Sequence, residues 1–198
     1  MISVVGFLSR PHGLSALDAL LKNPNIVIKK IFTHSLNPKS QDPTRSVRDD
    51  FSLFEKICIE NKIKLEKIDS KNDKILEIPE CDYIVEVSWR YFIPKEICLK
   101  ASKKSYGIHR GKLPDYAGSE PIKQALMKSE NFIVLSVHNL LADIDMGEII
   151  NYVKHPVNYD SDRTLDENIQ RLRDEITPLF ATLVIQTLEQ LEKKNLMS

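Results

Sequence analysis

Residues 106–118 read YGIHRGKLPDYAG, and this stretch contains three of the six glycines in the chain. It places His109 beside Arg110, ahead of a Pro-Asp-Tyr turn. Neither a helix nor a strand requires such residues, so the segment is predicted to be a tight loop. An imidazole and a guanidinium held in a tight loop also make it a candidate functional site.

A second cluster, HNLLADIDMG, covers residues 138–147 and holds His138, Asp143, Asp145 and Gly147. Taken alone, His138 could be a hydrogen-bonded core histidine and Asp145 a turn residue. Together the two clusters supply two imidazoles and two carboxylates, the groups of a general acid–base site. A metal site is disfavoured, because the spacing of His109, His138 and Asp145 matches no compact motif such as HExxH.

The rest of the chain alternates strand and helix patterns, which predicts an α/β fold with a sheet that is parallel at least in its first half. Ligands bind such sheets at the carboxyl ends of the strands, so function is expected in the loops after Leu8, Ser88, His109 and His138. Pro178 is expected to kink or split the last helix, at residues 164–193. Ser119 is expected to cap the helix at residues 120–128. The expected strands are 2–8, 26–33, 64–68, 83–88, 106–109, 132–140 and 148–157, and the expected helices are 14–22, 47–61, 73–78 (or a turn), 95–101, 120–128 and 164–193.

Composition limits the class of protein. The 198 residues are 42% hydrophobic and 28% charged, which predicts one globular domain over residues 1–198. The net charge is zero, so no general polyanion surface and no nucleic-acid partner are expected. The three scattered cysteines favour buried thiols over a disulfide framework or a zinc site, and no apolar run is long enough for a membrane span. These features favour a cytoplasmic protein, with residues 35–50 as a long polar surface loop.

The sequence GFLSRPHG at residues 6–13 ends the first strand and opens the first helix. A helix N-terminus suits anion binding, which makes Arg10, His12 and Gly13 a candidate phosphate site. The segment fits neither the GxGxxG nor the Walker pattern, so this signal is weak.

The run GIHRGKLPDYAGSEPIKQAL followed by VHNLLADIDMGEII resembles the folate-dependent formyltransferases. The resemblance implies a Rossmann-like fold with a mostly parallel central sheet and helices on both faces. It also implies transfer of a formyl group from 10-formyltetrahydrofolate to the amine of a small substrate, such as glycinamide ribonucleotide or an amino sugar. A tRNA acceptor is not expected, because no basic tail or further domain follows the last helix.

The resemblance also implies roles for individual residues. His109 falls on the catalytic histidine that stabilises the oxyanion, Asp145 on the aspartate that tunes it, and His138 on a supporting histidine. Gly107 stands where the family has an asparagine that holds the formyl oxygen, so a non-catalytic relative and a formyl hydrolase stay open as alternatives. The implied cofactor-binding residues are Trp89, Arg90, Tyr91, Phe92, Ile93, Leu140, Asp143 and Gly147, and the implied substrate-binding residues are Arg10, His12, Gly13, Arg110 and Glu175.

Overall fold

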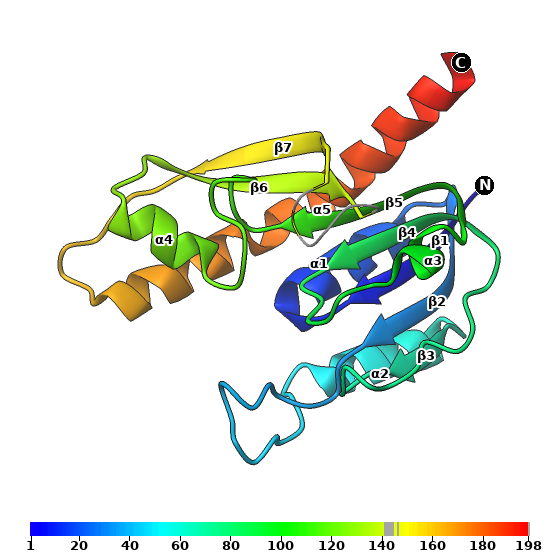
Figure 1. Ribbon diagram of the computed structural model, residues 1–198, viewed down its shortest axis with the longest axis horizontal. Helices are drawn as coiled ribbons and strands as arrows, with labels where there is room; N and C mark the ends of the chain where they lie inside the picture. Colours follow the sequence, from blue (N-terminus) through cyan, green and yellow to red (C-terminus); the bar gives the residue numbers. More distant parts are fainter. Residues whose placement is uncertain (141–144, 146, 198) are drawn as a thin grey trace.

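The computed structural model describes residues 1–140, 145 and 147–197, and a seven-stranded sheet forms its centre (Figure 1). The strand order is β3-β2-β1-β4-β5-β6-β7, in which β1 to β5 are parallel and β6 and β7 are antiparallel to their neighbours. The predicted α/β fold with a mostly parallel sheet is therefore confirmed. The strands are β1 (Ile2–Leu8), β2 (Ile26–Thr33), β3 (Lys64–Lys67), β4 (Cys81–Val87), β5 (Ala101–His109), β6 (Phe132–Asn139) and β7 (Ile149–Pro156).

The central strand β1 is apolar on both sides because both faces of the sheet are covered. Val4 and Leu8 belong to one buried cluster, whereas Val5 and Phe7 belong to the other, and all four are inaccessible to solvent. A continuous apolar run is typical of such a doubly covered parallel strand.

The two faces are covered differently. The helices are α1 (Arg10–Lys22), α2 (Phe51–Glu60), α3 (Lys95–Cys98), α4 (Pro121–Met127) and α5 (Leu165–Met197). Residues of α1, α2, α4 and α5 all join the larger cluster, on the Val4 and Leu8 face. The opposite face is covered by the short α3 and by irregular chain from segments 68–78 and 89–93. This thinner cover leaves room for a cavity on that side.

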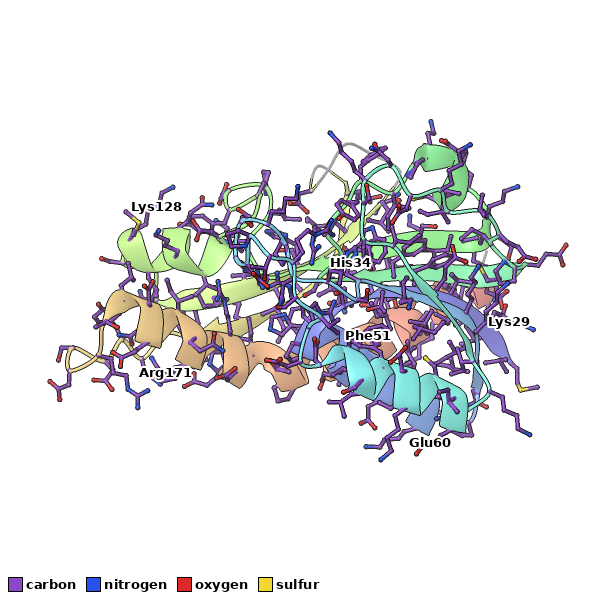
Figure 2. All side chains as sticks on the ribbon, turned by 90° about the horizontal axis from the view of Figure 1, so that it is seen from below. Lys29, His34, Phe51, Glu60, Lys128 and Arg171 are labelled. Atoms are coloured by element: carbon purple, nitrogen blue, oxygen red, sulfur yellow. The ribbon has the colours of Figure 1, made fainter. Side chains whose placement is uncertain are left out.

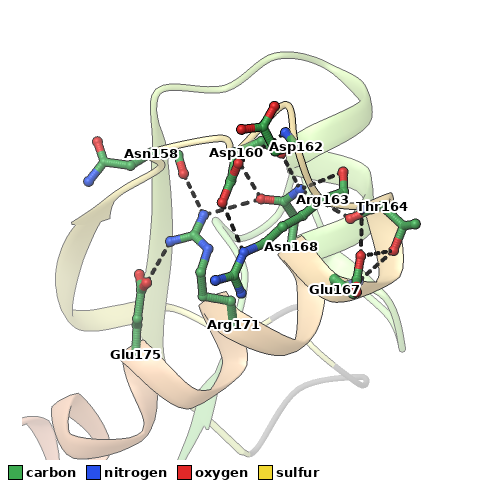
Figure 3. Close-up of polar contacts among 9 residues, drawn as sticks. All are labelled: Asn158, Asp160, Asp162, Arg163, Thr164, Glu167, Asn168, Arg171 and Glu175. Atoms are coloured by element: carbon green, nitrogen blue, oxygen red, sulfur yellow. Dashed lines mark hydrogen bonds and ion pairs between the residues drawn. The ribbon is translucent and has the colours of Figure 1, made fainter.

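The last helix is continuous through Pro178, so of the predicted kink or split at that residue, the split is wrong. Buried Ile176, Phe180 and Leu183 lie on either side of the proline and pack both halves against one core. A capping box lies at the start of this helix: the Glu167 carboxylate accepts from the Thr164 backbone N–H at 2.8 Å, and the Thr164 hydroxyl oxygen accepts from the Glu167 N–H (Figure 3). In the described part of the chain, no helix is long and apolar enough to cross a membrane.

Other local predictions also differ from the structure. Residues 73–78 form no helix, and the N-cap of α4 is Glu120 rather than Ser119, without a side-chain capping bond. Helix α1 begins at Arg10, four residues earlier than the periodicity predicts, because Pro11 is compatible with a first helical turn.

Candidate functional site

A cavity of about 390 Å³ opens beyond the carboxyl ends of β1 and β4. These two strands are neighbours at the point where the strand order reverses, which is where α/β sheets bind their ligands. The loops after the first, fourth, fifth and sixth strands, where function is expected, therefore contribute residues to one cavity. The predicted site residues that line the cavity are Arg10, Trp89, Arg90, Tyr91, Phe92, Ile93, His109, Arg110, His138, Leu140 and Asp145.

Asp145 lies between the two imidazoles. Its Oδ1 is 3.4 Å from His109 Nδ1 and 3.6 Å from His138 Nε2. The backbone N–H of Gly118 donates to its Oδ2 at 3.1 Å, which holds the carboxylate in place. Burial lowers the pKa of both histidines, and the Asp145 charge opposes that effect. The carboxylate therefore stabilises a proton on either ring.

The hydrogen bonds of His109 determine which ring nitrogen is basic. Its Nε2 lies 2.8 Å from the carbonyl oxygen of Tyr116, an atom that only accepts, so Nε2 carries a proton. A neutral His109 therefore has its lone pair on Nδ1, the nitrogen that faces Asp145.

Glu86 is a site residue that the sequence analysis missed. It lies on β4 and lines the cavity, and its Oε1 accepts the backbone N–H of Trp89 at 2.7 Å. Desolvation, followed by the Asp145 charge, raises the pKa of the Glu86 carboxyl to about 8. The carboxyl is therefore largely protonated at neutral pH, while the backbone N–H bond of Trp89 opposes this shift.

At two positions near these groups, both occupied by glycine, the surrounding atoms leave no space for a side chain. A Cβ on Gly107 would lie 2.5 Å from Glu86 Oε2 and 3.1 Å from His138 Nε2. A Cβ on Gly147 would lie 1.8 Å from the carbonyl oxygen of Asn139. The missing side chain of Gly107 thus leaves space for the Glu86 carboxyl. The missing side chain of Gly147 allows the backbone at that residue to lie close to β6.

Segment 88–93 forms a wall of the cavity and is supported by His34, which the sequence analysis also missed. The His34 Nδ1–H donates to the Ile68 carbonyl, and its Nε2 accepts the Arg90 backbone N–H at 3.1 Å. The ring stacks on Trp89 at a centroid distance of 4.0 Å. Figure 2 shows His34 in the interior, whereas Lys29, Glu60 and Lys128 lie at the periphery. Burial lowers the pKa of His34 to about 3, so it is a neutral structural support.

The cavity wall is rich in arginine. Arg10, Arg90 and Arg110 all line it, and Arg10 reaches Gln41 in the 35–50 loop with a hydrogen bond of 3.0 Å. Burial, and then the nearby Arg173 and Arg10 charges, lower the pKa of Arg110 to about 10. Since Asp145 is shared by two imidazoles and Glu86 is largely neutral, these arginines leave the cavity with excess positive charge.

Backbone strain gathers at the same place. Arg10, Ser88 and Asp145 line the cavity and have φ values of 64°, 56° and 58°. Non-glycine residues in this left-handed region are uncommon and cluster at binding and catalytic sites.

Besides Gly107, four predicted site residues are not part of the cavity wall. His12 is buried, stacks on Phe180 at 4.4 Å and contacts the Arg173 carbonyl, and burial lowers its pKa to about 4. Gly13 packs α1 on β1, because a Cβ there would lie 2.9 Å from the Leu8 carbonyl carbon. Gly147 packs against Asn139, as described above.

Glu175, the fourth, pairs with other side chains. It bonds Arg171 at 2.5 Å, one turn earlier on α5, and His155 at 2.9 Å on β7 (Figure 3 shows the Arg171 contact). Asp143, predicted to bind the cofactor, lies outside the described residues. Within the described ranges, no group of three or more His, Cys, Asp and Glu side chains could hold a metal ion.

Comparison with known proteins shows which family the sequence resembles. The family model described as formyl transferase matches residues 5–183. The methionyl-tRNA formyltransferase of Sulfurihydrogenibium sp. is 29% identical over 131 residues, which cover 65% of this chain and 40% of that protein. The enzyme of the same name from Lactobacillus delbrueckii is 22% identical over 193 residues, covering 96% and 58%. The chain spans about half the length of the curated relatives it matches.

Solved structures share the fold. The phosphoribosylglycinamide formyltransferase of Brucella melitensis superposes with a TM-score of 0.69 and 16% identity, covering 96% of this chain and 94% of that one. A formyltetrahydrofolate deformylase from Pseudomonas syringae gives 0.68 and 18%, covering 97% and 62%. The family match extends over most of the sequence and includes the His109 and Asp145 loops, and on that basis this chain belongs to the formyl transferase family.

Proposed function

We propose that this protein transfers the formyl group of 10-formyltetrahydrofolate to the amine of a small substrate, such as glycinamide ribonucleotide or an amino sugar. The observation that carries the proposal is the position of Asp145 between His109 and His138 at the wall of the cavity. Family membership supports the reaction type, and the acceptor is inferred from the cavity.

The geometry supports a general-base role for His109. Its Nε2–H is bound to the Tyr116 carbonyl, so Nδ1 is the nitrogen free to take a proton from the attacking amine. The Asp145 carboxylate, 3.4 Å away, stabilises the imidazolium that forms. A positioned acid or base of this kind contributes about 10²- to 10⁴-fold to a rate.

The chemistry of the wall fits a folate head group. Ile93, Leu140 and Phe180 offer apolar surface, and the volume lies in the range of small-molecule sites. When bound, the folate supplies the formyl group.

The arginines favour an acceptor that carries negative charge. Arg10 and Arg110 are desolvated and repel one another, and an anionic group between them would relieve that repulsion. Phosphorylated amines such as glycinamide ribonucleotide have this chemistry, whereas an uncharged amino sugar lacks it. We therefore infer an anionic amine as the preferred acceptor.

A formyl hydrolase is the second candidate. Gly107 places no side chain over the reacting centre, and the base that would deprotonate an amine could equally deprotonate water. The fold is also that of a formyltetrahydrofolate deformylase, although the likeness extends to the fold alone.

The test follows the formyl carbon. Donor labelled with ¹³C in the formyl group is mixed with protein, alone and with a panel of phosphorylated amines, amino sugars and methionyl-tRNA. Formation of an N-formyl amine that is lost in His109→Ala supports the proposal, and the productive acceptor identifies the substrate class. Formate release without an acceptor indicates the hydrolase, and an unchanged donor in every mixture contradicts both functions.

A further inference from the structure

The Glu86 carboxyl is a titratable group in the cavity that the mechanism above does not use. Side chains alternate along a strand, so Glu86 projects from the same face of β4 as Ile84, toward the thinly covered side of the sheet. Gly107 is its neighbour on β5 and pairs in turn with His138 on β6. Glu86 thus lies next to the two imidazoles and Asp145 instead of in the apolar core.

The two oxygens of Glu86 have different surroundings. Oε1 accepts the Trp89 N–H, which fixes the carboxyl group. Oε2 occupies the space above Gly107, 2.5 Å from where a Cβ would be, and no described residue forms a hydrogen bond with it. A proton on the carboxyl therefore belongs on Oε2, the oxygen that faces the reacting groups.

Two carboxyls thus share one cavity in different surroundings. The Asp145 carboxylate lies between the two imidazoles and accepts the Gly118 N–H. Glu86 is desolvated and faces that charge, so its pKa is raised to about 8. A carboxyl that its surroundings keep neutral can donate a hydrogen bond at neutral pH.

We propose that Glu86 is a catalytic residue that works in its neutral form, with Oε2–H donating a hydrogen bond to the formyl oxygen during transfer. This inference rests on the proposed function. The amine nitrogen forms a bond to the formyl carbon while the C=O electron pair moves to the oxygen, which Glu86 stabilises. The pair then returns, the bond from carbon to the folate nitrogen breaks, and the proton lost by the amine passes to that nitrogen through His109.

The experiment compares Glu86→Gln with Glu86→Met. Glutamine keeps an acceptor for Trp89 and an N–H donor for the substrate, whereas methionine keeps only the size. We expect Glu86→Gln to retain kcat within a few fold at pH 7, and Glu86→Met to lose about a hundredfold, the effect of removing one such donor. Equal kcat in Glu86→Met and wild type would overturn the proposal.

The pH profile separates catalysis from packing. Glu86 must be protonated, so the wild-type rate should fall above about pH 8. The groups that face it are His109, His138, Asp145 and Arg90; both histidines have lowered pKa values and titrate on the acid side. The alkaline fall should vanish in Glu86→Gln, since an amide does not titrate. A fall that persists there, measured with the same acceptor, would assign it to another group and overturn the proposal.

One readout does not need turnover. A stable 10-formyl folate analogue labelled at its carbonyl is bound to each protein, and its C=O stretch is recorded by infrared difference spectroscopy. A donor on the formyl oxygen lowers this frequency, so the shift should be present in wild type and Glu86→Gln and lost in Glu86→Met. Wild-type protein that binds the analogue and shows the shift without transferring formyl would refute the proposed function while supporting the role of Glu86. An analogue that binds without the shift would refute that role, and one that does not bind would refute both.

Discussion

At the scale of single residues, the site depends on one carboxylate that serves two rings. Asp145 raises the pKa of both His109 and His138 against the effect of burial. Its backbone lies in the left-handed region and its Oδ2 is held by Gly118. The position of this carboxylate is therefore set by strain and by hydrogen bonding together.

Replacing Asp145 with Asn should reduce kcat for formyl transfer by about a hundredfold or more, because the imidazolium of His109 loses its counter-charge. The acid limb of the pH profile should move to lower pH, since both histidines lose the charge that raises their pKa. Steady-state kinetics against pH checks both effects, with Asp162→Asn at an exposed position as the matched control. An acid limb that stays in place would contradict the assigned role.

Gly147 should tolerate no side chain. The Cβ of alanine would lie 1.8 Å from a backbone oxygen of Asn139, which cannot turn aside as a side chain can. We expect Gly147→Ala to lower the free energy of unfolding by about 3 kcal/mol. Gly118→Ala is the control: nothing lies within 4 Å, and its φ of 98° should cost only about 1–2 kcal/mol. Urea denaturation compares them, and equal losses would show that the close approach to Asn139 does not matter.

At the scale of elements, the sequence predicted most of the strands and the loops that carry the site. The apolar runs at 2–8 and 26–33 match β1 and β2, and the loops after the predicted strands converge as expected. Boundaries were less certain: the pattern for 47–61 is periodic, yet α2 begins only at Phe51 because the 35–50 loop continues to Asp50. Periodicity marks the apolar face of a helix and not where its hydrogen bonding starts.

Glu86, which the sequence did not reveal, and the candidate residues that lie away from the cavity each have a physical reason for their place. Glu86 sits in the run YIVEVS, where a single charge looks like a strand position facing solvent, and only the thin cover of that face turns it into a cavity group. His12 and Gly13 stand at a helix start, where the same pattern serves anion binding or packing against β1. Glu175 did carry a signal: Arg171 lies four residues earlier on the helix, the spacing of an intrahelical ion pair.

Because His34 supports segment 88–93 in its neutral form, the free energy of unfolding should depend on pH. His34 has a folded pKa of about 3 against about 6.5 when unfolded, so the unfolded chain takes up its proton first. Stability is therefore full above about pH 6.5 and is lost as the pH falls toward about 3, by up to about 1.4 kcal/mol per pH unit. His12 adds to the same loss down to about pH 4.

Substitution of His34 by Gln should reduce the slope of the free energy of unfolding against pH by up to about 1.4 kcal/mol per pH unit, the contribution of one proton. The reason is that glutamine keeps a donor and an acceptor without titrating. Urea denaturation of both proteins between pH 5 and 7 gives the two slopes. Identical slopes would show that His34 is protonated in the folded state and would contradict its role as a neutral support.

At the scale of the whole molecule, zero net charge conceals a positive cavity. The 28 basic and 28 acidic residues balance over the chain, yet Arg10, Arg90 and Arg110 meet at one end of the sheet. Zero net charge implies no general polyanion surface and says nothing about such a local field. The fold creates it by bringing the ends of β1, β4 and β5 together.

The central claim is that this cavity holds the formyl-bearing folate, and the most direct test is calorimetric titration of the intact protein with a stable 10-formyl folate analogue. Wild type should bind with a saturable micromolar Kd. Ser88→Trp, which adds a bulky side chain to the cavity wall, should abolish binding, and Ser102→Trp, which lies outside the cavity near Lys100, should leave it unchanged. No binding up to millimolar analogue by the folded wild type, or equal binding by Ser88→Trp, would contradict the account.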